Sequence, residues 1–347
     1  MLHARVTLKD VAKRAGVHPS TASRALNSGA GRTSDATVER VLLAAAALGY
    51  EPDQVARALK TKRTFLVGVA VPDLLNSVFP AVVRGLETVL GEAGYIVILS
   101  NTDDDVARER ASVRAMISRQ VDGLVLMTSH LKSNLMEELS GLRIPVVLVG
   151  RLVDGLAIPS VACDDFGGES EAVAHLVSLG HRRIAHVGGP QDTSTGRDRF
   201  HGYVAGLREH GLEEDPALIA MAAGFDHESG AQALRELLGW TRDFTAITTA
   251  SDAIAFGCFD ALAEAGLTIP GDVSLVGFGD WPASLRTSPP LTTVAFSHDE
   301  IGRIGGRLLL AQLAGQAPPG EPIRVSGQLT VRSTTFIRSE SVPVSPA

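Results

Sequence analysis

The chain has 347 residues, more than one domain usually holds, and its 45% hydrophobic and 20% charged residues are typical of a globular protein. These values exclude collagen, coiled coil and disorder as descriptions of the whole chain, and no apolar run reaches the roughly 18 residues of a membrane span. The two cysteines, Cys163 and Cys258, are too few for a disulfide framework. Because the start lacks the apolar core of a signal peptide, we expect a cytoplasmic protein of two or three domains.

The charge of the chain changes sign along its length. Residues 1–63 hold eleven Lys and Arg against five Asp and Glu, although the whole chain has a net charge of −7. A basic head on an acidic body indicates that the head contacts a polyanion such as DNA and that the body does not. Chance clustering of surface charge explains the same counts equally well.

Two short helices are predicted at the start of the head. Thr7 is a suitable N-cap for the first, with Asp10 as its capping-box partner, and Gly16 ends it. After one residue the chain restarts at His18 and Pro19, and proline is well tolerated as the first residue of a helix. A short turn between two helices, the second with small polar residues and an arginine facing outward, is the helix-turn-helix pattern.

A third helix and a linker complete the head. Ser34 is placed to cap this helix. Its apolar positions are Val38, Val41, Leu42, Ala45 and Leu48. Residues 51–60 then predict about two turns of helix, a length that is marginal in water by itself. Taken alone, this alanine-rich stretch favours a flexible linker.

Four segments of the head and linker resemble the lactose/galactose repressor (LacI/GalR) family. They are 6–17 (VTLKDVAKRAGV), 21–27 (TASRALN), 48–52 (LGYEP) and 55–59 (VARAL). The match runs continuously and in order, so it is far more specific than a lone motif. The resemblance implies a transcriptional repressor whose second helix enters the major groove and whose linker helix forms on DNA.

The resemblance also assigns residues to DNA. Arg24 is the expected guanine reader, because a guanidinium matches the O6 and N7 atoms of guanine, and Ser20 can contact either base type. Pro19 offers only an apolar contact, and Leu59 matches a leucine that wedges into the minor groove. The residues expected to contact DNA are Thr7, Leu8, His18, Pro19, Ser20, Thr21, Ser23, Arg24, Asn27, Leu59 and Lys60.

From residue 65 onward, continuous apolar strands alternate with helices, which indicates parallel sheets covered on both faces. Strands are predicted at 65–71, 95–99, 123–127, 144–149, 184–188, 217–222, 245–249, 273–278 and 327–337. Helices are predicted at 78–93, 105–119, 132–140, 167–180, 198–211, 227–238, 253–265 and 298–314. Because the pattern begins again after about residue 160, two similar lobes follow one another.

In the LacI/GalR family such a body resembles periplasmic sugar-binding proteins, and the chain crosses between the lobes three times. The expected fold class is therefore an all-α helix-turn-helix DNA-binding domain plus a two-lobed, periplasmic-binding-protein-like α/β effector domain with parallel sheets. The expected parts are 5–50 (DNA-binding), 51–64 (hinge helix and linker), 65–338 (effector binding and dimerisation) and 339–347 (frayed tail). Lobe 1 is expected at about 65–162 plus 294–323, and lobe 2 at about 163–291 plus 326–338.

Open α/β sheets bind ligands at the carboxyl ends of their strands, so the cleft between the lobes is the expected effector site. Arg199 matches an arginine that commonly holds a ligand hydroxyl or carboxylate in the family, and a surface arginine is the alternative. The resemblance assigns to the effector Asn76, Phe79, Thr195, Arg199, Phe225, Ser251 and Asp280. Gly150 and Gly279 stand where the family often has aspartates, so we expect a less acidic pocket that admits an anionic or sugar-acid effector.

The sequence holds no phosphate loop, no His-Glu-x-x-His metal pair and no nucleophile elbow, so we expect no catalysis, metal or cofactor. It favours a regulator that binds a palindromic operator and a small sugar-type effector, and that associates with the nucleoid when bound. Without C-terminal leucine heptads we expect a homodimer and no dimer of dimers. The alternatives are a solute-binding transport protein, disfavoured by the basic head, and a sugar-modifying enzyme, disfavoured by the missing catalytic groups.

Overall fold

The computed structural model divides the chain into two compact units, Met1–Thr64 and Phe65–Ala347, which we call the head and the body. The described residues are 6–27, 33–51, 58, 62–128, 130–131, 135–140, 144–155, 157–317 and 319–338. Most of the predicted hinge, including Leu59 and Lys60, lies outside the described residues, as does the predicted frayed tail at 339–347.

In its described part the head contains three helices, α1 (Leu8–Ala15), α2 (Pro19–Asn27) and α3 (Asp35–Leu48). The Asp10 carboxylate accepts hydrogen bonds from the Thr7 backbone N–H at 2.9 Å and from the Thr7 hydroxyl at 2.6 Å, which fixes the start of α1. Gly16 ends α1 with a φ of +68°, a left-handed conformation that glycine adopts without strain. The predicted capping pair and the predicted end of this helix are confirmed.

The core of the head is built from small side chains where the three helices meet. Its buried members are Val11, Ala12, Ala22, Ala25, Val41, Ala44 and Ala45. The prediction that Leu42 faces this core is wrong, since its side chain is 50% exposed. The buried stripe of α3 runs through Val41, Ala44 and Ala45, and Leu42 lies about 100° further around the helix than Val41.

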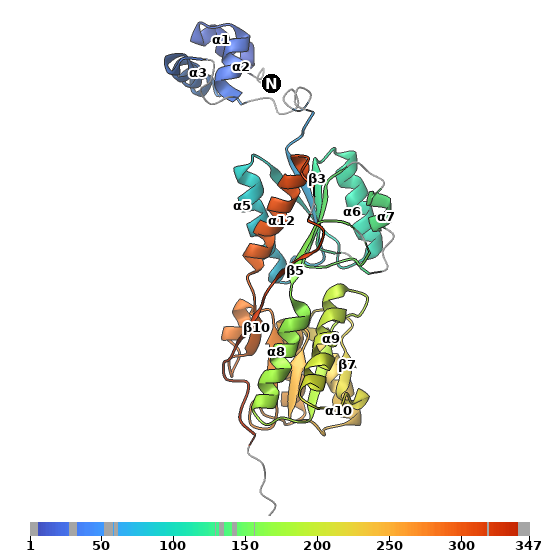
Figure 1. The fold of residues 1–347 in the computed structure, drawn as a ribbon. Helices are drawn as coiled ribbons and strands as arrows, with labels where there is room; N and C mark the ends of the chain where they lie inside the picture. Colours follow the sequence, from blue (N-terminus) through green and yellow to red (C-terminus); the bar gives the residue numbers. More distant parts are fainter. Residues whose placement is uncertain are drawn as a thin grey trace, which may run out of the picture. The chain divides into compact units, whose positions relative to one another are not determined.

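In the described residues the body has two six-stranded sheets, one in each lobe (Figure 1). The sheet of lobe 1 has the order β11-β5-β4-β3-β1-β2, and its pairs are all parallel. Its strands are β1 (Leu66–Val71), β2 (Ile96–Asn101), β3 (Gly123–Leu126), β4 (Val146–Val149), β5 (Ser160–Cys163) and β11 (Ile323–Val325). Figure 1 shows one pair of helices on each face. These helices are α5 (Val78–Glu92) with α12 (His298–Leu313), and α6 (Val106–Ser118) with α7 (Leu135–Ser140).

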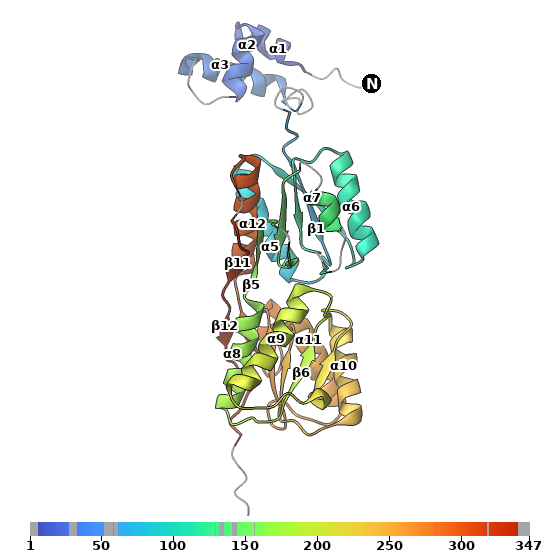
Figure 2. The ribbon, with the colours of Figure 1, turned by 45° about the vertical axis from the view of Figure 1, so that its right-hand side comes forward.

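The sheet of lobe 2 has the order β12-β10-β9-β8-β6-β7 and is parallel except for β12, which runs antiparallel to β10. Its strands are β6 (Ile184–Gly188), β7 (Ile219–Met221), β8 (Ala246–Thr249), β9 (Ser274–Phe278), β10 (Thr292–Ala295) and β12 (Gln328–Thr330). Its helices are α8 (Asp165–Ser178), α9 (Ser194–Glu209), α10 (His227–Trp240) and α11 (Asp252–Glu264), with 3₁₀ turns η1 (Pro216–Leu218) and η2 (Pro282–Leu285). Figure 2 shows this lobe with its helices on both faces of the sheet.

Burial follows the apolar pattern of the sequence. Strands β3, β4 and β5 are buried along their whole length, whereas the edge strand β2 is partly exposed. This is the burial that uninterrupted apolar strands predict for the centre of a parallel sheet. Among the helices of the described ranges, none is both long and apolar enough to cross a membrane.

Within the described part of the body the chain crosses between the lobes three times: from β5 to α8, from β10 to α12 and from β11 to β12. The strands β5, β10 and β11 are missing from the prediction. The predicted strand at 327–337 is ordered as a strand only in β12. Val294, which the predicted division places in lobe 1, pairs with Phe278 in the sheet of lobe 2.

Helix pairs in both lobes pack through glycine. A Cβ atom at Gly302 of α12 would meet the carbonyl oxygen of Val82 on α5. In lobe 2 a Cβ atom at Gly257 of α11 would meet the carbonyl oxygen of His227 on α10. Because the two backbones touch, no side chain fits between them, and the distance between the paired helices is fixed.

Candidate functional site

A cavity of about 720 Å³ lies between the two lobes of the body. Its lining comes largely from segments that follow the carboxyl ends of strands, among them β1, β4, β6 and β9. This is the edge at which open parallel sheets bind ligands, and cavities of roughly 300–1,000 Å³ hold small organic molecules. The body therefore has a ligand-sized cavity at the place predicted from the sequence.

The wall from lobe 2 is organised around Arg199 of α9. Its Nε donates to the Asp165 carboxylate at 2.8 Å, its Nη2 lies 2.7 Å from the same oxygen, and its Nη1 donates to the carbonyl oxygen of Ala250. The guanidinium also lies over the ring of Phe278, 3.8 Å from its centroid. Burial raises the pKa of Asp165 to about 6, although the guanidinium acts against this. Arg199 is held in place from three sides.

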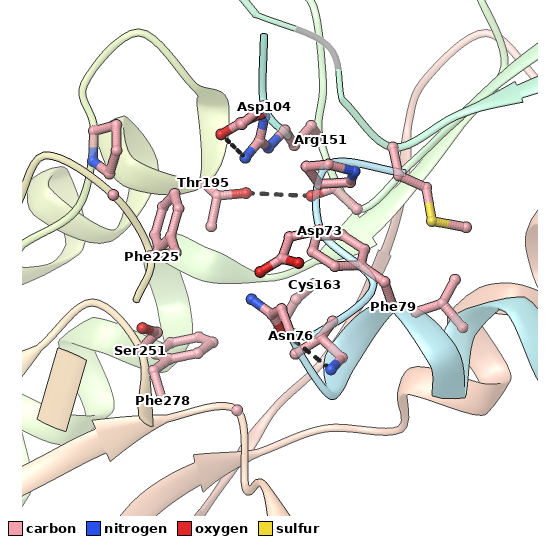
Figure 3. A pocket seen from close by; sticks show the side chains of 18 of the residues that line it. Asp73, Asn76, Phe79, Asp104, Arg151, Cys163, Thr195, Phe225, Ser251 and Phe278 are labelled. Atoms are coloured by element: carbon pink, nitrogen blue, oxygen red, sulfur yellow. Dashed lines mark hydrogen bonds and ion pairs between the residues drawn. The ribbon is translucent and has the colours of Figure 1, made fainter. Parts of the chain in front are cut away.

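The wall from lobe 1 contains a second arginine–aspartate pair. Arg151, which follows β4, donates to the two carboxylate oxygens of Asp104 at 2.6 and 2.9 Å, as Figure 3 shows. The Nε2 of His130 lies 3.4 Å from Asp104, and its Nδ1 lies 3.1 Å from Asp192 of lobe 2. Burial acts to raise the pKa of Asp104, but hydrogen bonds with His130 and Arg151 hold it far below its usual value. The Asp104 carboxylate in turn raises the pKa of His130, against the effect of burial.

His130 also belongs to a contact between the lobes that is independent of the three crossings. Besides the approach of its ring to Asp192, the backbone N–H of Leu131 donates to the carbonyl oxygen of Asp192 at 2.8 Å. A second such contact joins the backbone N–H of Leu152 to the hydroxyl of Ser194 at 2.7 Å. The lobes are therefore joined at the cavity by hydrogen bonds as well as by the chain.

Aromatic rings line the cavity from both lobes. Phe79 comes from α5 in lobe 1 and Phe225 from the loop before α10 in lobe 2, and both border the same space in Figure 3. Trp281 packs edge-on against Phe256, with ring centroids 6.0 Å apart. Aromatic faces beside paired polar groups suit a ligand that carries both C–H surfaces and hydroxyl groups.

Six of the seven residues predicted to bind an effector line the cavity: Asn76, Phe79, Thr195, Arg199, Phe225 and Ser251. The seventh, Asp280, is not among the lining residues, and its carboxylate accepts a hydrogen bond from Arg332 at 2.5 Å. Two of the six also stabilise the fold. The Thr195 hydroxyl donates to the carbonyl oxygen of Gly150 at 3.3 Å, and the Ser251 hydroxyl caps α11.

The prediction missed several cavity residues, including Asp104, Arg151 and His130. Of the three consecutive aspartates at 103–105, only Asp105 caps a helix, accepting from the backbone N–H of Arg108 at 2.7 Å. Asp104 lines the cavity instead. An arginine two residues after a buried strand, as Arg151 is after β4, was the signal available in the sequence.

The cavity wall holds more acidic than basic side chains. Two arginines face six aspartates, which are Asp73, Asp103, Asp104, Asp165, Asp192 and Asp226. Each of the six already accepts from a protein group; Asp73, for example, accepts from the backbone N–H of Leu75 at 2.8 Å.

The candidate DNA-facing residues of the head lie on and around α2. His18, Ser20 and Arg24 are exposed, and Pro19 is the first residue of α2, as predicted. The Nδ1 of His18 lies 2.8 Å from the Ser20 hydroxyl, so this histidine occupies the capping position. The Nε of Arg24 donates to the carbonyl oxygen of Ser20 at 3.2 Å, which lays the guanidinium along α2.

The other candidates in the head differ in exposure. Leu8 packs against the core of the head, and Ser23 is partly buried. The Thr21 hydroxyl lies 3.5 Å from the Nη2 of Arg24. Asn27 is the last residue of α2. Thr7 is exposed at the start of α1, where its hydroxyl already donates to Asp10.

We next looked for metal-binding groups and reactive thiols in the described part of the chain. No group of three or more His, Cys, Asp and Glu residues there is placed to hold a metal ion. Cys163 lines the cavity and Cys258 lies in the core of lobe 2. Burial raises the pKa of both thiols, so neither forms a thiolate readily.

Comparison with known proteins places the whole chain in one family. Residues 7–53 match the model of bacterial regulatory proteins of the lacI family, and residues 173–335 match a periplasmic binding protein-like domain. The HTH-type transcriptional regulator RegA of Clostridium saccharobutylicum is 36% identical over 309 residues, which cover 88% of this chain and 92% of RegA. The HTH-type transcriptional repressor CytR of Escherichia coli K12 is 33% identical over 329 residues, which cover 95% and 96%.

Solved structures of the same architecture extend the match to three dimensions. The Lac repressor dimer bound to operator and the anti-inducer ONPF superposes with a TM-score of 0.85 at 29% identity, covering 96% of this chain and 100% of the repressor chain. The complex of the transcriptional regulator CelR with cellobiose has a TM-score of 0.73 at 31% identity, covering 95% and 100%.

The fold and its relatives define a transcriptional regulator and not an enzyme, with a helix-turn-helix head and a two-lobed body of the periplasmic-binding-protein type. This chain belongs to the lacI family of bacterial regulatory proteins. The resemblance and the fold class predicted from the sequence are both confirmed.

Proposed function

We propose that this regulator represses transcription by binding a palindromic operator as a homodimer, under the control of a neutral sugar or sugar derivative in the cavity. The observation that carries the effector class is the cavity wall, where both arginines are already paired with aspartates between aromatic rings. Paired carboxylates keep lone pairs that accept from hydroxyls, and the rings cover the C–H face of a sugar. A sugar acid would add negative charge beside six aspartates.

The effector residues that we propose are the six predicted ones that line the cavity together with Asp104 and Arg151. Two relatives support a sugar-type ligand. CelR is described in complex with cellobiose, and the Lac repressor in complex with the anti-inducer ONPF. Both share the two-lobed body with this chain, which supports a ligand between the lobes here as well.

The homodimer is supported by apolar side chains exposed on lobe 1. Ile96 and Leu99 on the edge strand β2 are 66% and 40% exposed, and Leu75 beyond β1 is 93% exposed. Apolar side chains at a sheet edge are typical of a surface that another subunit covers. In a twofold-symmetric dimer, two heads would face the two half-sites of a palindrome.

DNA reading is assigned to α2, with Arg24 as the guanine contact and Pro19 and Ser20 beside it. Leu59, outside the described residues, is proposed as the minor-groove wedge, followed by Lys60 at the phosphates. In a dimer the effector would act by favouring one lobe arrangement, because a ligand shifts an equilibrium only by its difference in affinity for the two states.

The effector class is tested by thermal unfolding of the full chain with D-glucose, D-galactose, D-ribose, cellobiose, D-gluconate and D-galacturonate. We expect one or more neutral sugars to raise the unfolding midpoint, since a ligand at 100 times its Kd stabilises by about 2.7 kcal/mol. Stabilisation by the two sugar acids alone, or by no compound, contradicts the proposal.

The DNA part is tested by selecting binding sites from a random duplex library and then titrating the selected operator. Arg24→Ala should cost about 1–3 kcal/mol of specific affinity and relax the preference at one base pair in each half-site. Arg14→Ala, at an exposed arginine of α1, is the matched control and should leave the sequence preference unchanged. Equal weakening of Arg24→Ala on all sequences would make Arg24 a phosphate contact.

A further inference from the structure

His130 of lobe 1 contacts lobe 2 away from the three places where the chain crosses. It lies in the segment after β3, and its partner Asp192 lies in the segment between β6 and α9. The Nδ1 atom of His130 is 3.1 Å from a carboxylate oxygen of Asp192. The backbone N–H of Leu131 donates to the carbonyl oxygen of the same aspartate at 2.8 Å. One short segment of lobe 1 is thus joined to one residue of lobe 2 through both a side chain and the backbone.

Each ring nitrogen of His130 faces a carboxylate. Nδ1 faces Asp192, and Nε2, which is buried, lies 3.4 Å from Asp104. An ionised carboxylate only accepts hydrogen bonds, and a neutral imidazole has a single N–H, so the neutral ring can donate to one of the two aspartates at most. The imidazolium form has two N–H groups and can donate to both. The contacts on both sides of the ring are therefore complete only when each nitrogen carries a proton.

The charged groups around His130 come from both lobes. Asp104, Arg151 and the buried Glu109 belong to lobe 1, and Asp192 belongs to lobe 2. The Asp104 carboxylate raises the pKa of His130 against the effects of burial and Arg151, and Asp192 adds to the rise. Because the ordinary pKa of histidine is about 6.5, a raised value brings the titration close to neutral pH.

The two aspartates differ in how firmly they are held. Asp104 accepts two hydrogen bonds from Arg151 of its own lobe, whereas the side chain of Asp192 is 58% exposed and belongs to the other lobe. When His130 loses a proton, we expect its remaining N–H to stay with the fixed carboxylate of Asp104. The lone pair of Nδ1 then faces Asp192, and an exposed carboxylate can turn away from it into water. Deprotonation therefore weakens the contact between the lobes and spares the contact within lobe 1.

We propose that His130 is a proton-dependent link between the lobes, which holds them together through Asp192 when it is protonated and lets them separate when it is neutral. The proposal goes beyond the function proposed above, because it makes pH an influence on the lobes that needs no effector. Asp192 favours the charged ring only while the lobes are together, so their association takes up protons. Association is favoured below the pKa of His130 and weakens as the pH rises through it.

The test is hydrogen–deuterium exchange of the full chain at pH 6 and pH 9, without ligand and resolved to single amides. Protection factors compare the intrinsic with the observed exchange rate, which removes the direct effect of pH on exchange. The reporters are the two amides that donate across the lobes, from Leu131 to Asp192 and from Leu152 to Ser194. In the wild type we expect both protection factors to fall about two- to fivefold between pH 6 and pH 9, the size expected for a contact between partly exposed charged groups.

His130→Gln and Asp192→Asn should each abolish this fall, because either change removes one of the two charges. The matched control is His227→Gln. His227 also faces an aspartate, Asp260, at 2.9 Å, but both of these residues lie in lobe 2, so the fall should keep its wild-type size. The amide of Met127, which donates within lobe 1, should have the same protection factor throughout and so establish that the lobe stays folded.

Three outcomes overturn the proposal. Protection factors of the wild type that do not change with pH remove the dependence on protons. An equal fall in His130→Gln assigns the titration to another group. A fall at Leu131 alone, with Leu152 unchanged, confines the change to the segment after β3 and leaves the lobes together. None of these outcomes involves a sugar, so the proposed effector class is tested separately.

Discussion

Each lobe contributes one arginine–aspartate pair to the cavity wall, yet the surroundings move the two carboxyl groups in opposite directions. In lobe 2, Asp165 is buried beside Arg199, and burial raises its pKa to about 6. In lobe 1, Asp104 pairs with Arg151 and also faces His130, its side chain is 36% exposed, and its pKa is lowered. The same pairing of residue types thus has opposite electrostatic results.

The comparison indicates that burial and hydrogen bonding, more than the presence of an ion pair, decide the sign of the pKa shift. Asp165 is buried, so losing its hydration outweighs the attraction of Arg199 and Arg324. Asp104 keeps contact with solvent, and hydrogen bonds with His130 and Arg151 stabilise its charged form. The carboxyl group in the wall of lobe 2 therefore takes up a proton closer to neutral pH, and the one in the wall of lobe 1 stays ionised to a lower pH.

Removing the arginine from each pair gives the largest expected contrast. Arg199→Ala should lower the free energy of unfolding by about 3–5 kcal/mol, because it leaves a buried carboxylate unpaired. Arg151→Ala should cost only about 1–2 kcal/mol, since water can reach Asp104. Urea unfolding of both variants measures the difference, and equal losses would remove the distinction between the two walls.

The helix packing, unlike the cavity walls, should behave alike in the two lobes. Gly302→Ala in lobe 1 and Gly257→Ala in lobe 2 should each cost about 2–3 kcal/mol, because a methyl group would meet a backbone carbonyl of the neighbouring helix. Gly239→Ala, at an exposed helical position with open space around it, should instead stabilise by about 0.5–1 kcal/mol. Thermal unfolding reports all three. If Gly302→Ala left the unfolding midpoint unchanged while Gly257→Ala lowered it, close helix packing would be essential in lobe 2 and not in lobe 1.

The pH dependence of His298 is the next effect in size. Burial and the nearby Arg199 guanidinium lower the folded pKa of this residue to about 4, below the ordinary value of 6.5, so the unfolded chain takes up a proton first as the pH falls from 6.5 to 4. The wild type should lose stability over that window, by at most about 1.4 kcal/mol per pH unit, and His298→Phe should lose less. Unfolding titrations at pH 6.5 and pH 5 give the comparison. Parallel losses in both proteins would show that His298 does not titrate in this way.

His130 should show the opposite and smallest trend. Its pKa is raised by Asp104, so its contribution to stability is complete at a pH below about 6.5 and disappears as the pH rises through the folded pKa. Between pH 6 and pH 9 the wild type should lose a few tenths of a kcal/mol relative to His130→Gln, given that the partners are partly exposed. A wild type that gains stability over this range relative to His130→Gln would reverse the assignment.

Much of the fold could be predicted because the signals are local. Thr7, Asp10 and Gly16 define one helix within ten residues, and the central strands are uninterrupted apolar runs. Where the local signal is polar, boundaries shift. Helix α9 begins at Ser194, four residues before the predicted start at 198, because the Thr193 hydroxyl accepts from the backbone N–H of Gly196 at 3.2 Å.

The cavity was harder to predict because its polar groups pair over long sequence distances. Arg199 and Asn76 were assigned by family resemblance, and they do line the cavity. Asp104 and Arg151 are 47 positions apart, and no periodicity connects a residue after β2 with one after β4.

The three crossings have a mechanical consequence. All of them join the same edges of the two sheets, since β11 and β5 end the order in lobe 1, and β12 and β10 end it in lobe 2. A single connecting segment would let one lobe rotate freely against the other. Three connecting segments side by side permit little besides opening and closing about one axis. The relative position of the lobes thus reduces to one angle. A small molecule that favours one value of that angle therefore moves the closely packed helices α5 and α12 of lobe 1 together, as one rigid unit.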